Sequence, residues 1–338
     1  MNAKIKDICL ATGLSVGTVC EALNGKPRVA EKTRKRVREV AEQLNYRPNN
    51  LGRALQSRRS SLLGYFCIDI TVSFLAEVLH ELTFAATAKG YGILFQTPLY
   101  SSESEIDRID FLLSKNVECI ITSGCEPATW EYLRKIKKRG IPVIGTSCYS
   151  MFPEIPYVVT DDYLGGETAA NCLLDLKHRK MAFFSLDRLP NYREPGFKET
   201  LQKKGIGSCV SCHSVDRLAA LCAAPPVERI SAIFAYCDED ALIAKRTVEK
   251  SGLRVPDDVS IIGFDDSLNS RLEEVNLSTL AHATKTIGTE TINSVLKEIN
   301  RESTESILIP PILKLRKSTR NCKHPQSNNI INPRRTEK

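Results

Sequence analysis

The chain has 338 residues, of which 42% are hydrophobic and 26% are charged. These proportions exclude a collagen-like or low-complexity chain, and at roughly 150 residues per domain the length predicts two domains. No apolar run approaches the roughly 20 residues of a membrane-spanning helix, and the N-terminus has no continuous apolar stretch of signal-peptide length. We therefore expect a cytoplasmic protein that has no membrane partner.

The net charge of +7 is unevenly distributed along the chain. Residues 1–60 hold thirteen Lys and Arg against five Asp and Glu, whereas residues 61–314 hold twenty-seven against thirty-four. Residues 315–338 are again basic, with seven against one. A basic head on an acidic body indicates a module that binds a polyanion, attached to a larger domain with another task. Nucleic acid is the leading candidate for the polyanion, and a solvated basic face is the alternative.

Three short helices are predicted in the first 47 residues. The first ends at Thr12, and Gly13 then gives the backbone the freedom that a tight turn requires. Ser15 is placed to cap a second helix that ends near Asn24. Its inward positions are expected to be Val16, Val19, Cys20 and Leu23. A third helix is predicted over 31–45. Two helices joined by a short turn with glycine are typical of a helix-turn-helix, whose second helix enters the DNA major groove.

From Ser61 onward, short apolar runs alternate with amphipathic stretches. Strands are predicted at 62–67, 92–95, 119–122, 142–145, 181–185, 232–236 and 259–264. Helices are predicted between them, for example at 75–89, 103–115, 165–176 and 239–251. This alternation predicts an α/β body with parallel sheets that are covered by helices. Ligands of such folds bind beyond the carboxyl ends of the strands.

The sequence lacks the common enzyme and cofactor motifs. It has no Gly-x-Gly-x-x-Gly, no phosphate-loop Gly-Lys-Ser/Thr and no His-Glu-x-x-His, and its five histidines form no ligand cluster by spacing.

The twelve cysteines are scattered, and in a cytoplasmic chain they are expected to be reduced core residues. Cys209, Cys212 and His213 have the spacing of a haem-attachment motif, which we interpret as a coincidence. We predict no enzyme activity, no cofactor and no metal; a sugar- or nucleoside-processing enzyme is a disfavoured alternative.

Several motifs follow one another in a characteristic order. In the head they are KIKDICLA (4–11), TGLSVGTV (12–19), ALNGKP (22–27), EKTR (31–34) and LNYRPN (44–49). In the body they are VVTDDYLGG (158–166), REPGF (193–197), AIFAYCDEDAL (232–242) and GLRVPDDVSIIGFDD (252–266). With these motifs the chain resembles the lactose-repressor/galactose-repressor (LacI/GalR) family of bacterial transcription regulators, up to about residue 320.

The resemblance implies four segments. Residues 1–47 would be an all-α helix-turn-helix head, and 48–60 a hinge, with a simple linker as the alternative. Residues 61–317 would form a two-lobed, periplasmic-binding-protein-like body that binds an effector and dimerises, with one parallel sheet in each lobe. The chain would recross between the lobes near 286–300. Residues 318–338 are polar and basic, and we expect a disordered tail.

The resemblance also implies which residues face DNA. In the family, a leucine of the hinge opens a base step in the minor groove, and Leu55 occupies that position. Base recognition would rest on Val16, which can touch a thymine methyl, and on Glu21, which can accept from cytosine N4. Ser15, Gly17, Thr18, Asn24, Arg34 and Asn49 complete the predicted set; Thr18, Asn24, Arg34 and Asn49 are assigned to phosphates. Gly17 and Glu21 depart from the family pattern, so the operator is expected to differ from the common one.

Six residues match or adjoin the family's effector contacts. Arg193 can hold a carboxylate, a phosphate or sugar hydroxyls, and Asp265 can accept hydroxyl protons. Cys237 stands beside Asp238 where the family commonly has an amide side chain. Ser73 and Phe74 follow the first strand, and Phe74 can stack on a ring. The alternatives are a structural ion pair for Arg193 and Asp265, and core packing for Phe74.

The resemblance therefore implies a ligand-responsive regulator that binds a palindromic double-stranded operator as a homodimer or tetramer, most simply as a repressor. The rival interpretation is a cytoplasmic small-molecule-binding protein whose head no longer recognises DNA.

Overall fold

The computed structural model describes residues 3–23, 25–46, 59–98, 105–186, 192–206 and 209–322. The chain divides after Ser60 into two units, a head (1–60) and a body (61–338), and each is described by itself. None of the described helices is both long and apolar enough to cross a membrane.

The head is a bundle of three short helices, as the sequence predicts. They are α1 (Ile5–Thr12), α2 (Val16–Leu23) and α3 (Glu31–Gln43). Gly13 ends α1 in the left-handed conformation (φ 71°), which glycine adopts without strain. The shared core consists of Ile8, Val19, Ala22, Val29, Val37 and Ala41, none of which is more than 7% exposed.

The predicted packing of α2 is wrong in one respect. Val16 was expected to point inward but is 50% exposed, and Cys20 lies outside the buried core of the head. The helix packs through Val19 and Ala22, which are three positions apart and share one face. Val16 and Cys20 are four positions apart and share the neighbouring face, on which Val16 is exposed and Cys20 half-buried.

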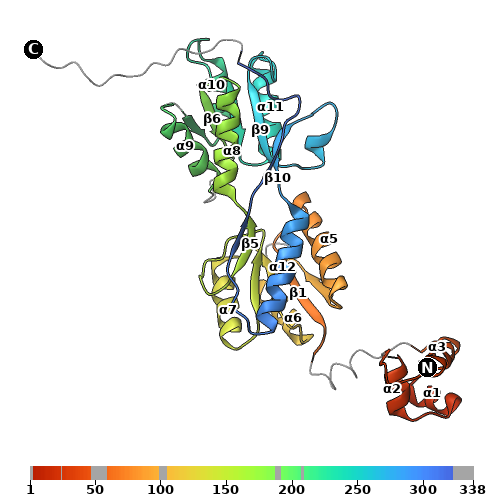
Figure 1. The fold of residues 1–338 in the computed structure, drawn as a ribbon. Helices are drawn as coiled ribbons and strands as arrows, with labels where there is room; N and C mark the ends of the chain where they lie inside the picture. The colour runs from red at the N-terminus through yellow and green to blue at the C-terminus, as the bar shows by residue number, and fades with distance from the viewer. Residues whose placement is uncertain are drawn as a thin grey trace, which may run out of the picture. The chain divides into compact units, whose positions relative to one another are not determined.

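The body contains two lobes, each built on one six-stranded sheet (Figure 1). The first sheet has the strand order β11-β5-β4-β3-β1-β2, and all its pairs are parallel. Its strands are β1 (Leu62–Cys67), β2 (Gly92–Gln96), β3 (Ile120–Ser123), β4 (Val143–Thr146), β5 (Tyr157–Thr160) and β11 (Ile307–Ile309). Its helices are α5 (Ser73–Ala88), α6 (Glu105–Ser114), α7 (Pro127–Lys138) and α12 (Thr284–Ile299). Helices α5 and α12 pack together on one side of the lobe's core, and α6 and α7 on the other.

The second sheet has the order β12-β10-β9-β8-β6-β7, parallel except for the antiparallel edge strand β12. Its strands are β6 (Met181–Phe184), β7 (Cys209–Cys212), β8 (Ala232–Ala235), β9 (Ser260–Asp265), β10 (Ser278–Ala281) and β12 (Ile312–Lys314). Its helices are α8 (Asp162–Asp175), α9 (Arg193–Lys203), α10 (Val215–Ala223), α11 (Asp238–Lys250) and the 3-10 turn η1 (Asn269–Arg271). The α/β architecture with parallel sheets is confirmed.

The chain passes three times between the lobes. It leaves the first lobe after β5, returns after β10, and leaves again between β11 and β12. The predicted recrossing near 286–300 is therefore wrong: this segment is α12, which packs against α5 inside the first lobe (Figure 1). The crossings themselves fall at Asp161, at residues 282–283 and at residues 310–311.

Residues 318–322, assigned to a disordered tail by the sequence, belong to the second lobe. Ser318 is 3% exposed and donates from its hydroxyl to the carbonyl of Ile261 at 2.7 Å. The backbone N–H of Cys322 donates to the carbonyl of Leu176 at 2.8 Å. These bonds satisfy polar backbone groups at the edge of the lobe, which composition alone does not indicate. Residues 323–338 lie outside the described part of the chain.

The spacing of Cys209 and Cys212 does not bring their thiols together. The two residues bound strand β7, and they pack into different core clusters, Cys212 with α10 and α11 and Cys209 with α8 and α9. Residues three apart in a strand point to opposite faces of the sheet. All twelve cysteines are free thiols.

Candidate functional site

The exposed face of α2 carries the predicted base contacts. Ser15 caps the helix: its hydroxyl accepts the backbone N–H of Thr18 at 3.2 Å. Val16 and Gly17 follow in the first turn and are exposed, and Glu21 is half-buried one turn later. Helix α2 carries no Lys or Arg. This face therefore offers one apolar side chain and one carboxylate to a ligand.

Arg34 is engaged inside the head. Its guanidinium donates to the carbonyl of Gly25 at 3.3 Å and lies 2.6 Å from the carboxylate of Glu31. These contacts tie the start of α3 to the turn after α2. The phosphate contact of Arg34 stays a prediction, and it would compete with Glu31. The predicted DNA-facing residues Asn24, Asn49 and Leu55 lie outside the described residues.

A close helix crossing places Arg193 beside Asp162. These residues begin α9 and α8, which make a close contact through two glycines. A Cβ on Gly166 would lie 2.1 Å from the carbonyl oxygen of Arg193, and one on Gly196 would lie 2.1 Å from that of Tyr163. Any larger residue would force the two backbones apart, so the glycines fix the spacing of the two charged side chains.

The guanidinium of Arg193 is held on several sides. It donates to Asp162 Oδ1 at 2.8 Å and to the carbonyl of Tyr236 at 2.6 Å, and it lies 3.6 Å from Asp265 Oδ1. Its plane lies 3.6 Å from the centroid of the Phe264 ring, a cation–π contact. Burial opposes the charge of Arg193, but the carboxylates of Asp162 and Asp265 outweigh it and raise its pKa. The ion pair that was the alternative interpretation of Arg193 and Asp265 is therefore present, and each of its side chains is 8% exposed.

The Asp265 carboxyl is the most perturbed acid of this group. Burial raises its pKa to about 7, and the positive charge of Arg193 offsets only part of the rise. Its backbone has φ 109°, a region that residues with a side chain rarely adopt. Strained backbone of this kind clusters at ligand sites. At neutral pH, Asp265 is thus poised between its neutral and ionised forms.

Asp238 and Cys237 are placed differently although they are neighbours. Asp238 is fully buried and points into the second lobe, where it accepts from the Thr279 hydroxyl and from the backbone N–H of Ser267, both at 2.6 Å. Cys237 caps α11, since its Sγ accepts the backbone N–H of Asp240 at 3.5 Å. Cys237 is therefore beside Asp265, whereas both oxygens of Asp238 are occupied within the lobe.

Cys237, Glu239 and Asp265 each offer one ligand atom, and these atoms lie within 4.8 Å of one another. Such a set suits either a cation or the hydrogen-bond donors of an organic ligand. The guanidinium of Arg193 already places a positive charge next to Asp265. This positive charge disfavours a cation beside Asp265.

On the side of the first lobe, Phe74 faces this group through His282. Ser73 and Phe74 begin α5, and the Phe74 ring stacks on the imidazole with centroids 4.0 Å apart and an interplanar angle of 17°. His282 follows β10 and lies 3.0 Å from Asp265 Oδ1 through Nε2, and 2.6 Å from the Thr160 hydroxyl through Nδ1. Phe74 and Asp265 thus contact His282 directly, while Arg193 and Cys237 lie beside Asp265.

Sequence reasoning missed His282. Burial and the nearby Arg193 charge lower its pKa to about 3, so the imidazole is neutral at physiological pH. Its bonded partners lie 17 and 122 residues away in the chain, and a single histidine after a strand has no spacing that marks it as functional.

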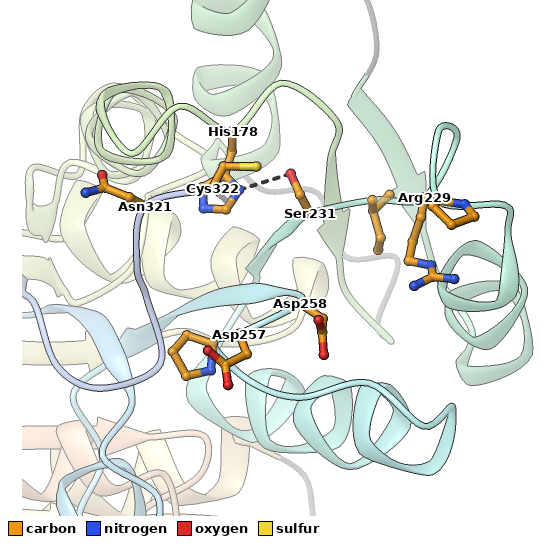
Figure 2. A pocket seen from close by; sticks show the side chains of 10 residues that line it. His178, Arg229, Ser231, Asp257, Asp258, Asn321 and Cys322 are labelled. Carbon is orange, nitrogen blue, oxygen red and sulfur yellow. Dashed lines mark hydrogen bonds between the residues drawn. The ribbon is translucent and has the colours of Figure 1, made fainter. Parts of the chain in front are cut away.

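A cavity of about 120 Å³ lies elsewhere in the second lobe, at the amino ends of β8 and β9 (Figure 2). His178, Ser231 and Cys322 are among its lining residues. The imidazole of His178 bonds to the Ser231 hydroxyl and to the carbonyl of Arg320, each at 3.0 Å. Because Asp265 ends β9, this cavity and the Arg193–Asp265 group lie at opposite ends of the strands. We interpret the cavity as a packing feature where the C-terminal segment closes the lobe.

Comparisons with known proteins agree with this architecture. Residues 4–49 match the family of bacterial regulatory proteins, lacI family, and residues 170–319 match the periplasmic binding protein-like domain. Catabolite control protein A of Priestia megaterium is 29% identical over 95% of this chain and 100% of that protein. The HTH-type transcriptional repressor CytR of Escherichia coli (strain K12) is 26% identical over 88% of this chain and 90% of that protein.

Solved structures show the same fold. The lac repressor dimer bound to operator and the anti-inducer ONPF matches with a TM-score of 0.80 at 20% identity, over 95% of this chain and 100% of that chain. The complex of the transcriptional regulator CelR with cellobiose matches with a TM-score of 0.65 at 22% identity, over 94% of this chain and 99% of that chain. The chain thus carries a helix-turn-helix domain that matches the lacI family and a body segment that matches the periplasmic binding protein-like domain, and along almost its whole length it is similar to transcription regulators.

Proposed function

We propose that the protein is a ligand-responsive repressor of the cytoplasm that binds a palindromic operator as a homodimer. A small, sugar-like or nucleoside-like effector would bind among Phe74, Arg193, Cys237 and Asp265. Effector binding would shift the populations of two arrangements of the lobes and thereby change the affinity of the paired heads for DNA. The protein would not be an enzyme.

One observation carries the DNA-binding part of the proposal. The head that matches the lacI family at residues 4–49 folds into three helices whose second member leaves Val16 and Gly17 exposed on one face. This is the face that a helix-turn-helix protein inserts in the major groove. The relatives named as transcriptional repressors support the direction of regulation.

The effector part rests on the buried polar group. The Asp265 carboxyl, whose pKa is about 7, and the Phe74 ring both contact His282, and the Arg193 guanidinium lies beside Asp265. Such convergence of polar and aromatic side chains is typical of small-molecule sites. The cellobiose complex of CelR and the sucrose complex of a relative from Weissella paramesenteroides support a sugar-like ligand.

Selection of bound duplexes from random DNA tests the proposal. The full chain should enrich an inverted repeat, because two heads related by a two-fold axis recognise two equal half-sites. Enrichment of no sequence would contradict the regulator proposal.

Glu21→Arg, tested in the same selection, should change the preferred base at one symmetric position of each half-site. Arginine favours guanine, whereas a carboxylate accepts from cytosine N4. Lys32→Arg is the matched control, because it lies on α3, outside the base-contacting face, and keeps its charge. An unchanged preference in the Glu21 variant would show that α2 does not contact bases.

A second candidate function is a small-molecule-binding protein whose head no longer recognises DNA. The absence of Lys and Arg from α2 and the carboxylate of Glu21 favour it, since a negative charge is repelled by phosphates. The random-DNA selection separates the two functions.

A further inference from the structure

Three side chains from different parts of the body form a buried chain of hydrogen bonds. Asp265 ends β9, His282 lies where the chain returns to the first lobe, and Thr160 ends β5, where the chain first leaves it. The distances are 3.0 Å from Asp265 Oδ1 to His282 Nε2 and 2.6 Å from Nδ1 to the Thr160 hydroxyl. Thr160 is 1% exposed, and the side chain of His282 is 5% exposed. The chain therefore links the proposed effector site to two of the three crossings between the lobes.

The imidazole has only one proton to place between these partners. The charged groups that face it are Arg193 from α9, Asp162 from α8 and Glu77 from α5, while Asp265 also faces Glu239 from α11. Burial keeps His282 neutral by lowering its pKa to about 3. A neutral imidazole donates through one nitrogen and accepts through the other.

Two arrangements of this chain satisfy both hydrogen bonds of the imidazole. With Asp265 ionised, Nε2–H donates to the carboxylate, and Nδ1 accepts the Thr160 hydroxyl proton. With Asp265 protonated, its O–H donates to Nε2, and Nδ1–H donates to the Thr160 oxygen. The second arrangement holds one more proton than the first. That proton resides on the carboxyl group, and the imidazole has moved its own proton from Nε2 to Nδ1.

We propose that His282 is a positioning residue that carries the protonation state of the Asp265 carboxyl to the Thr160 hydroxyl by exchanging its own proton between Nε2 and Nδ1. The stacked ring of Phe74 holds the imidazole plane so that both nitrogens stay in line with their partners. The exchange reverses the direction of the hydrogen bond at the last residue of β5, immediately before the first crossing.

This exchange of the His282 proton, which we call the relay, gives the effector site a chemical preference. That extension rests on the proposed function. A ligand that donates to Asp265, such as a polyhydroxyl compound or an amine, holds the carboxyl ionised and the imidazole proton on Nε2. A ligand that brings an anionic group next to Asp265 stabilises the protonated carboxyl and the opposite arrangement. Neutral or amine-bearing ligands and anionic ligands therefore produce opposite states at Thr160.

His178 is an internal control for the relay. Its Nε2 faces the carbonyl oxygen of Arg320 at 3.0 Å, and a carbonyl only accepts, so the Nε2 proton is fixed. Its Nδ1 lies 3.0 Å from the Ser231 hydroxyl. This histidine is also buried and bonded through both nitrogens, but within the described ranges its bonded partners are a hydroxyl and a carbonyl and not a carboxyl.

Nitrogen NMR of the full chain labelled only at histidine tests the proposal. Between about pH 8.5 and pH 5.5, the Nε2 resonance of His282 should change from the protonated to the unprotonated type, and the Nδ1 resonance should change the opposite way. The signal is assigned as the one that His282→Gln removes. The Nε2 of His178 should stay protonated throughout. A His282 tautomer that does not change, or a His282 that gains a second proton in this range, would overturn the relay.

Two variants of Thr160 sharpen the test. Thr160→Val removes the hydroxyl. When Asp265 is protonated, the buried Nδ1–H of His282 then has no acceptor. When Asp265 is ionised, Nδ1 is only left with an unused lone pair. Because a buried orphan donor is the more costly of the two, the tautomer change should shift to lower pH by about one unit. Thr160→Ser keeps the hydroxyl and should keep the midpoint. Equal midpoints in the two variants would contradict the role of Thr160. None of these readouts requires DNA, so failure of operator binding and failure of the relay are distinguishable.

Discussion

At the scale of residues, the buried charge of Arg193 organises the body's candidate site. It satisfies Asp162 and Asp265 together, and it lies against the Phe264 ring. Removing one partner of a buried ion pair leaves the other charge desolvated and unpaired. The stability of the site therefore depends on this side chain.

Arg193→Ala should lower the free energy of unfolding of the body by about 3–5 kcal/mol, because two carboxylates lose their counter-charge. The control is Arg254→Ala, whose side chain is 68% exposed and pairs with Asp257 and Asp258 at 3.4 and 3.3 Å. An exposed pair contributes about 0–1 kcal/mol. Urea unfolding of both variants measures the difference, and equal losses would show that the Arg193 pair is not buried in solution.

Most residues of this site could be predicted from the sequence, but His282, which links them, could not. Arg193, Cys237 and Asp265 lie in motifs that the family resemblance marks, and the structure brings them together. Asp162 lies within the matched segment 158–166 but was not recognised, because its partner is 31 residues away. His282 has no local signal, since its neighbours are determined by tertiary contacts alone.

At the scale of elements, seven of the twelve described strands were predicted from apolar runs, whereas β5, β7, β10, β11 and β12 were not. The predicted strands at 62–67, 92–95 and 232–236 agree with the structure within a residue or so. Strand β10 was not predicted because it begins with the polar residues Ser278 and Thr279, which are both fully buried in the structure. Their hydroxyls bond to the carbonyl of Arg316 and to Asp238, far away in the chain. Burial of such residues requires partners that no short window of sequence contains.

Gly196→Ala should destabilise the body by about 3 kcal/mol, because the new Cβ would lie 2.1 Å from the backbone of Tyr163 and the two helices would have to separate. The same separation should pull Arg193 away from Asp162. The matched control is Gln202→Ala on the exposed side of α9, which should change the stability by less than about 0.5 kcal/mol. Thermal unfolding of both variants checks the expectation; a stable Gly196 variant would mean that α8 and α9 do not pack this closely.

At the scale of the whole molecule, stability should depend on pH through His282. Its pKa is about 3 in the folded chain and near 6.5 in the unfolded chain. As the pH falls below 6.5, the unfolded chain binds the proton first, so stability that is fully present above 6.5 is lost toward pH 3. The raised pKa values of Asp238 and Asp265 act in the opposite direction, but burial of these two carboxyls is common to wild type and variant.

His282→Gln removes this titration and keeps one donor and one acceptor. Between pH 6.5 and pH 5, the stability of the wild type relative to this variant should fall by about 2 kcal/mol. His80→Gln, a substitution at an exposed position of α5, serves as the control and should track the wild type. Urea unfolding across this pH range measures both. A difference between wild type and His282→Gln that is constant with pH would mean that water reaches the imidazole.

The three crossings determine how the body can be divided. The first lobe takes its strands from residues 62–160 and 307–309 and its helix α12 from 284–299, so neither lobe is one continuous piece of chain. A stop codon after β10 would deprive the first lobe of a helix that packs against α5, although the deletion begins beyond the second lobe's main strands. Stop codons between β10 and the end of β12 should therefore be as damaging as early ones, and neither lobe can be produced alone by simple truncation.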